Sequence, residues 1–346
     1  MLNVKFWIAI IAAVTSLVVA LMNHLSTRSN QREIEAIRNA QKDRDAKRDY
    51  EYEARKRLYH ECGPILFQLG ELSAAAYHRI RQLAIIAKEG NLEPGSRSFF
   101  GDQYFLLSTL HRFLAPSAAL KILQRRLTFV DLSLDGRLQR EYLLARQAFF
   151  SLGGEFSFAK LNKPPLRYEP FAEDSDEKAR SAPAIYWRQG LPIGVMESAI
   201  ELLVNATEPG ALRVMTYAEF EAGFSKKQSD LHKEFKGMLF LFEDFHPRTR
   251  PILWRMLVTQ ACLYRALFLA NESSGHSLEL RDLSIVDPER LAFDWRSAAD
   301  DQVSDAEVFA PFATAEAYLA ERLEPLWKHI PVSDESRGAH GGTASV

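Results

Sequence analysis

The densest cluster of side chains that could do chemistry is the run EDFHPR from residue 243 to 248. Carboxylates beside a histidine can bind a divalent metal or carry general acid–base catalysis. Their spacing matches no established ligand pattern, and Pro247 indicates the end of a helix, where polar side chains gather as caps. Glu243, Asp244 and His246 are therefore the candidate catalytic residues only in the alternative that the chain is an enzyme.

A second group of residues is positively charged. Arg112, Lys121, Arg125 and Arg126 form a local basic patch that could contact phospholipid headgroups or nucleic acid. The whole chain carries a formal net charge of −2, so it has no global positive field. We therefore interpret the patch as a solvated helix face and do not expect nucleic acid as a partner.

A third motif contains two adjacent glycines. The run Gly153-Gly154-Glu155-Phe156 resembles the signature loop of diguanylate cyclases, which implies nucleotide and metal binding. One acidic position of that loop is missing here, and the preceding residues 142–152 have helical spacing instead of the strand that the loop requires. The glycines are predicted to end this helix.

The familiar cofactor motifs are missing from the sequence. It contains no GxxxxGK[ST] loop, no GxGxxG after a strand, no HExxH, no GxSxG and no paired CxxC. Its two cysteines, Cys62 and Cys262, are predicted to be buried thiols. We therefore expect no cofactor and no metal, and the sequence favours a non-enzymatic protein.

The elements that position these residues begin with an apolar segment, Phe6–Met22. Its 17 residues contain no charge, and at ~1.5 Å per residue they span about 25 Å, the short end of a bilayer-crossing length. The polar side chains of Thr15 and Ser16 can bond to the helix's own carbonyls. A cleaved signal peptide, with a site at Val18-x-Ala20, is the alternative, but the run is longer than a usual signal.

The charges that flank this segment predict its orientation. Arg28, Arg32, Arg38 and Lys42 follow it, whereas Lys5 alone precedes it together with the terminal amine. Positive charge collects on the cytoplasmic side of membrane helices. We expect an N-terminus outside and a C-terminal body in the cytoplasm.

Residues 26–62 are predicted to form a charged helical stalk. Acidic residues stand four positions before basic ones, as in Asp43–Lys47 and Glu51–Arg55, which supports a helix. A heptad frame started at Ile34 places charged residues at the core positions, so a coiled coil is not favoured. Gly63-Pro64 is predicted to break this helix.

The body is predicted to be all-α, with at most a short β element near 276–286. Pro116 is expected to start a helix, Thr216 and Glu219 have the spacing of a capping box, and Arg255 and Arg265 are expected at the edge of a buried helix. Further helices are expected over residues 193–205, 225–245, 251–270 and 305–330, the last one bent or broken at its prolines. The expected domains are a transmembrane anchor (1–25), the stalk (26–62), a helical subdomain (63–152), an irregular connection (153–192), a second helical subdomain (193–332) and a disordered tail (333–346).

These features together indicate a single-pass membrane-anchored protein whose body is an interaction or regulatory module at the cytoplasmic face. Its expected partners are the lipid bilayer, through the N-terminal helix, and a protein of unknown identity. One alternative is an enzyme with a site around residues 243–246. The other is a membrane-acting effector whose body senses a ligand.

Overall fold

The structure is a computed structural model. It describes residues 4–92, 99–128, 131–161, 166–168, 185–186, 188–208, 211–243, 245–247, 249–272 and 305–329. The strand expected near 276–286 and the tail expected at 333–346 lie outside the described residues.

Most of the described chain is helical, which confirms the prediction of a mainly α-helical protein. The α-helices are α1 (Val4–Lys88), α2 (Gln103–Leu127), α3 (Gly136–Ser151), α4 (Glu155–Lys160), α6 (Ile193–Leu202), α7 (Tyr217–Phe224), α8 (Asp230–Lys236), α9 (Pro251–Glu272) and α12 (Asp305–Trp327). Three short 3-10 helices are η1 (Phe99–Gly101), η2 (Leu132–Leu134) and η3 (Leu239–Leu241).

Two small sheets accompany these helices, at positions where the sequence had not indicated strands. β1 (Arg167–Tyr168) pairs in parallel with β2 (Ile185–Tyr186). β3 (Val204–Glu208) and β4 (Ala211–Val214) form an antiparallel hairpin in which Val204 faces Val214. The register shifts between Ala206 and Glu208, and Val214 is buried against the core. The dipeptide Pro209-Gly210 between the two strands is the turn signal that could have predicted this hairpin.

The chain divides into two compact units, residues 1–57 and residues 58–346. The N-terminal unit consists of the first part of α1, and the C-terminal unit contains the last part of α1 and every other element. A boundary within the second unit at residues 153–192 stays a prediction.

The predicted helix break at Gly63-Pro64 is wrong, because α1 continues through both residues to Lys88. Proline inside a helix removes one hydrogen bond and crowds the carbonyl four residues earlier. Pro64 is exposed, so water can reach the carbonyl that loses its partner. The opposite face of the helix is anchored, since Cys62, Leu66 and Leu69 are buried.

Prolines also fail to mark the ends of two other helices. Pro116 does not begin a helix but lies in the middle of α2, where Phe113 and Ala119 on either side of it are buried. α12 likewise is continuous through Pro311 and Pro325, so the predicted break there is wrong, whereas the alternative of a bend stays a prediction. Packing of the surrounding apolar side chains outweighs the local cost of the proline ring.

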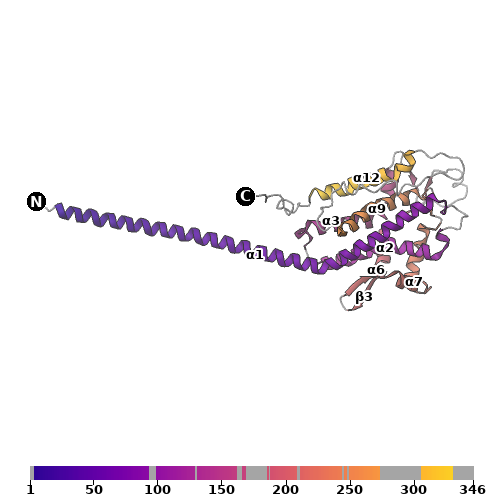
Figure 1. The fold of residues 1–346 in the computed structure, drawn as a ribbon, viewed down its shortest axis with the longest axis horizontal. Coiled ribbons are helices and arrows are strands. Elements are labelled where there is room, and N and C mark those ends of the chain that lie inside the picture. The colour runs from indigo at the N-terminus through magenta and orange to yellow at the C-terminus, as the bar shows by residue number, and fades with distance from the viewer. Residues whose placement is uncertain are drawn as a thin grey trace, which may run out of the picture. The chain divides into compact units, whose positions relative to one another are not determined.

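The centre of the C-terminal unit is α9, and its helical character agrees with the prediction for residues 251–270. Every residue from 251 to 264 is buried. The helix packs against α3, α4 and α12, and Figure 1 shows it running alongside α3 and α12. A helix that is apolar on all sides is stable in water only when other elements surround it in this way.

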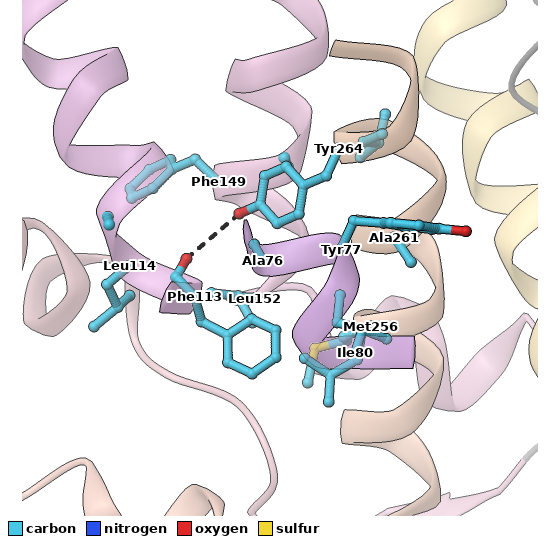
Figure 2. Close-up of a cluster of buried hydrophobic side chains, with 14 of the residues drawn as sticks. Ala76, Tyr77, Ile80, Phe113, Leu114, Phe149, Leu152, Met256, Ala261 and Tyr264 are labelled. Atoms are coloured by element: carbon cyan, nitrogen blue, oxygen red, sulfur yellow. Dashed lines mark hydrogen bonds between the residues drawn. The ribbon is translucent and has the colours of Figure 1, made fainter. Parts of the chain in front are cut away.

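The core forms where α1, α2 and α3 meet α9 (Figure 2). Ile80 comes from α1, Phe113 from α2, Phe149 from α3 and Tyr264 from α9, and all four side chains are buried. The Tyr264 hydroxyl donates a hydrogen bond to the Phe113 carbonyl oxygen at 3.4 Å, so the one polar atom of this aromatic side chain has a partner.

Two predictions about helix ends have opposite outcomes. The capping box is confirmed, because the Thr216 side chain accepts from the Glu219 backbone and the Glu219 side chain accepts from the Thr216 backbone. The continuous helix expected over 225–245 is wrong, since among the described residues of this range only those of α8 and η3 are helical. Ser229 caps the N-terminus of α8 by accepting from His232 N, and Gly237 ends it.

The helix ending at Gly153-Gly154 is confirmed. α3 stops at Ser151, and the Gly153 N–H donates to the Phe150 carbonyl while Gly154 donates to Ser151. Gly154 then serves as the N-cap of α4, whose first residue is Glu155. The glycines therefore make a tight turn between two helices and not the turn of a β-hairpin.

Candidate functional site

The most distinctive surface of the chain is the apolar first part of α1. Its large side chains are exposed, with Leu17 73% exposed, Met22 65% and Trp7 60%. By length and composition, the helix starting at Phe6 could cross a membrane, with a mean hydropathy of 2.2 over its most apolar window, none of which is buried. This is the candidate site that the sequence predicted at residues 6–22.

One of the two polar side chains inside this segment has a local hydrogen-bond partner. The Thr15 hydroxyl donates to the Ile11 carbonyl oxygen at 2.8 Å, as predicted from the sequence. Such back-bonding hides the hydroxyl from its surroundings, because both atoms belong to the same helix. The segment therefore presents an almost wholly apolar surface.

A second helical segment, Pro251–Leu269 in α9, also satisfies the length and composition of a membrane span. Its mean hydropathy is lower, at 1.3, and 83% of its window is buried inside the protein. Arg255 was expected at an edge but is only 5% exposed, and its Nη1 donates to the Phe158 carbonyl oxygen at 3.1 Å. α9 is thus a core helix, whereas nothing in the part of the chain that the structure describes buries the apolar segment of α1.

The predicted stalk carries ion pairs along one helix. Lys47 lies 3.9 Å from Glu51, and Arg48 lies 3.0 Å from Asp45. All four side chains are well exposed, so each pair stabilises the helix by only a few tenths of a kcal/mol. Lys47 was expected to pair with Asp43, and the structure instead gives it the carboxylate on its C-terminal side.

The residues proposed for the enzyme alternative are only partly described. Glu243 is exposed, His246 is buried at 5% exposure, and Asp244 lies outside the described residues. The backbone carbonyl of His246 accepts hydrogen bonds from Thr249 Oγ1 at 3.1 Å and from the Arg250 backbone N–H at 2.8 Å. These contacts belong to the turn that leads into α9, so His246 has a structural part there.

The predicted basic patch is neutralised in part by carboxylates from distant segments. Lys121 Nζ lies 3.3 Å from Glu201 Oε1, and Arg125 pairs with the same carboxylate. Arg126 Nη1 donates to Glu61 Oε2 at 3.0 Å. Among the described residues, only Arg112 of this patch has no ion pair.

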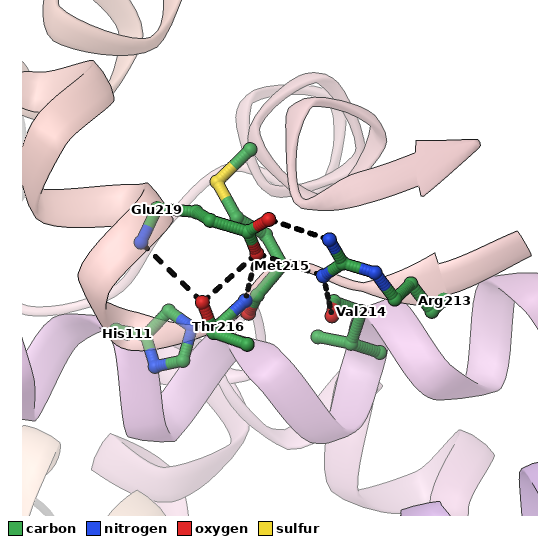
Figure 3. A network of polar contacts seen from close by, with 6 residues as sticks. All are labelled: His111, Arg213, Val214, Met215, Thr216 and Glu219. Atoms are coloured by element: carbon green, nitrogen blue, oxygen red, sulfur yellow. Dashed lines mark hydrogen bonds and ion pairs between the residues drawn. The ribbon is translucent and has the colours of Figure 1, made fainter. Parts of the chain in front are cut away.

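A polar network joins the β4–α7 turn to α2 (Figure 3). Arg213 Nη1 donates to Glu219 Oε2 at 2.7 Å, and the Thr216 N–H and hydroxyl donate to the same oxygen at 2.9 Å each. The hydrogen bond from Arg213, followed by those from Thr216, lowers the pKa of Glu219 to about 2. The carboxylate is therefore ionised at neutral pH, and it fixes the direction in which the chain enters α7.

His111 extends this contact from the side of α2. Its Nε2 lies 2.9 Å from the Met215 carbonyl oxygen, so Nε2 carries the proton and donates. Burial lowers the pKa of His111, which keeps the imidazole neutral. Figure 3 shows its ring beside the network, and the structure assigns it a positioning contact, not a catalytic one.

Sequence reasoning missed several polar residues that the fold brings into the interior. Gln189 is 2% exposed and accepts hydrogen bonds from the first backbone N–H groups of α9. Arg79 is also 2% exposed, on a helix that had been read only for its apolar face. No local spacing identifies either residue, because their partners lie far away in sequence.

Comparison with protein-family models, with curated proteins and with solved structures finds no match of any of the three kinds. Among the described residues there is no group of three or more His, Cys, Asp or Glu side chains that could hold a metal ion.

Proposed function

We propose that this chain is a single-pass membrane protein whose helical body acts as an interaction or regulatory module at the cytoplasmic face. The observation that carries the proposal is the exposed apolar segment of α1. Eleven large apolar side chains between Phe6 and Met22 are exposed among the described residues. At roughly 1.5 kcal/mol each, leaving them in water costs on the order of 10 kcal/mol, comparable with the whole stability of a domain.

A bilayer removes this cost because hydrocarbon surrounds the segment on all sides. The helical backbone satisfies its own hydrogen bonds, which is a requirement of any lipid-exposed chain. Trp7 near one end suits the interfacial region. Insertion therefore gives the segment the apolar surroundings that no other part of the described protein supplies.

The flanking charges favour a cytoplasmic body. Arg28, Arg32, Arg38 and Lys42 follow the segment, and only Lys5 and the amino terminus precede it. Each basic residue close to an anionic leaflet gains about 1 kcal/mol there. The first basic residues of the stalk would thus lie near cytoplasmic headgroups.

The anchoring proposal is tested by membrane extraction. The full chain should remain in the membrane pellet after an alkaline carbonate wash. The double variant Val14→Arg/Leu17→Arg should be released, because each arginine costs about 2.5–3.5 kcal/mol at a bilayer centre. The matched control is Ile34→Arg/Ile37→Arg, which places the same charges on exposed isoleucines outside the segment and should stay in the pellet.

Two results would count against the anchor: release of the full chain by carbonate, or equal behaviour of the two double variants. A chain lacking Phe6–Met22 should give a soluble, folded body. An unfolded product would contradict the proposal that the body folds independently of the anchor. The orientation of the protein in the membrane is measured by adding protease to sealed vesicles of which the outward-facing side is known. Cleavage of the body only from the cytoplasmic side supports the proposed topology.

The module part of the proposal needs its own experiment. Purification from gently solubilised native membranes, followed by mass spectrometry, should recover a protein partner in fixed stoichiometry. Recovery should survive in the Glu243→Ala and His246→Ala variants, since a binding module does not depend on those side chains. A preparation without a protein partner, but with a retained small molecule that either substitution removes, would favour the enzyme alternative instead.

A further inference from the structure

A buried arginine in the C-terminal unit lacks the partner that its charge requires. Arg79 of α1 is 2% exposed, and its Nη2 donates to Ser108 Oγ of α2 at 3.1 Å. Its Nε and Nη1 are buried and make no hydrogen bond. None of the ion pairs found in the described parts of the chain involves Arg79.

The surroundings of this guanidinium are aromatic. Its central carbon lies 5.5 Å from the ring centroid of Phe99 and 6.0 Å from that of Phe105, and the two rings stack on each other at 4.2 Å. Such cation–π contacts contribute about 0.5–2 kcal/mol. That is less than the several kcal/mol that an uncompensated buried charge costs, so the rings alone do not explain the site.

A second arginine adds to the positive field. Arg112, one helical turn beyond Ser108 on α2, is half-buried and likewise forms no ion pair with the described residues. Burial and then the charge of Arg112 lower the pKa of Arg79 to about 10, at which the guanidinium is still charged at neutral pH. Two neighbouring cations without a carboxylate attract an anion more strongly than either does alone.

The two unpaired nitrogens define the chemistry of the missing partner. Nε and Nη1 lie on different edges of the guanidinium, and each stands beside Nη2, which carries two N–H groups and uses one for Ser108. One free nitrogen and the second N–H of Nη2 form a planar fork that matches two oxygens of a phosphate or carboxylate group. The exposed Tyr104 and the half-buried Phe99 lie on the outer side of the cluster.

We propose that Arg79, with Ser108 and Arg112, forms a binding site for a small oxyanion, a phosphate or carboxylate group, in the helical body. All three residues belong to the helical body, so the site does not depend on the membrane anchor. The bound oxyanion would be a ligand to which the body could respond. The oxyanion would accept from one free nitrogen of Arg79, Nε or Nη1, and from the second N–H of Nη2, while the Phe99 and Phe105 rings exclude water from the pair.

The test uses the full chain in non-ionic detergent and measures thermal unfolding with sodium phosphate and with sodium chloride at equal ionic strength. Phosphate should raise the Tm by about 5 °C when its concentration is ~100 times its Kd. Arg79→Met should abolish that rise, and Arg79→Lys should reduce it because lysine has no fork. Titration calorimetry with phosphate should show one site that Arg79→Met removes.

The control is Arg255→Met, which removes another buried arginine but one that bonds to the Phe158 carbonyl. It should lower the Tm equally in both salts and keep the phosphate response. A short-chain phosphatidic acid distinguishes the source: stabilisation by inorganic phosphate indicates a free anion, and stabilisation by phosphatidic acid alone indicates a lipid headgroup. If neither anion stabilises the protein, or if Arg79→Met raises the Tm in both salts, the buried charge of Arg79 only destabilises the fold, and the proposal is refuted.

Discussion

Gln189 allows the strongest quantitative prediction about the fold. Its side-chain oxygen Oε1 accepts from Ile252 N at 2.9 Å and from Leu253 N at 3.1 Å. Ile252 and Leu253 are fully buried, so no water can replace the glutamine. These N–H groups belong to the first turn of α9, where a helix has no internal acceptors. Gln189→Leu keeps the size of the side chain and removes the acceptor.

The cost follows from the number of groups left without a partner. Each buried, unsatisfied N–H costs about 1–3 kcal/mol, so the two together cost about 2–6 kcal/mol. For a body of this size, that corresponds to a fall in Tm of about 5–10 °C. Gln189→Glu retains an oxygen acceptor at the positive end of the helix dipole and should cost less.

The assay is thermal unfolding of the detergent-solubilised full chain, followed by far-ultraviolet circular dichroism. Gln228→Leu is the control, because Gln228 is exposed and the same substitution there removes no buried hydrogen bond. Its Tm should lie close to that of the unmodified chain. If Gln189→Leu lowers the Tm no more than Gln228→Leu does, the cap contributes nothing and the reasoning from buried donors fails.

Three further outcomes are expected. Gly63→Ala should stabilise the chain by about 0.5–1 kcal/mol in urea unfolding, because its added methyl group meets no atom and Gly63 lies inside a helix. Gly190→Ala should destabilise the chain, because the new Cβ would lie 3.0 Å from the backbone oxygen of Leu152, which cannot move aside as a side chain can. The free energy of unfolding should fall as the pH drops below about 6.5, because the pKa of His111 is lowered in the folded chain and the unfolded chain therefore binds the proton first. In the His111→Gln variant, the free energy of unfolding should depend less steeply on pH over this range. The thiol of Cys62, buried and with its pKa raised to about 11, should react with iodoacetamide only after denaturant is added, and fast labelling of the native protein would contradict its burial.

Local patterns predicted local structure well. The capping box depends on Thr216 and Glu219, three residues apart, and the structure contains it. The prolines show the limit of such patterns. Pro64 and Pro116 have the same ring chemistry as a helix-ending proline, but both lie inside helices. Pro64 is exposed and Pro116 is buried, and in each helix the neighbouring apolar side chains pack into the core. The low helix propensity of proline is a free-energy cost, and packing with the rest of the fold decides whether that cost is compensated.

The partners of the charged side chains could not be predicted from the sequence. Arg125 and Glu201 are 76 positions apart, so nothing in the sequence around Arg125 indicates that a carboxylate pairs with it. Arg79 was hidden for the same reason, because only the fold places Ser108 beside it. The fold brings the residues of a candidate site together, and their spacing in the sequence does not indicate that they become neighbours.

The central place of α9 has a consequence for how the protein is made. The helix that closes the core ends at residue 272, and α12, which also packs on it, ends at residue 327. At ~5–20 residues per second, a ribosome needs about 10–40 s to extend the chain from residue 58 to the end of α9. During that time the apolar faces of α1, α2 and α3 have no centre to pack on. We therefore expect the nascent body to expose apolar surface until α9 has left the ribosome.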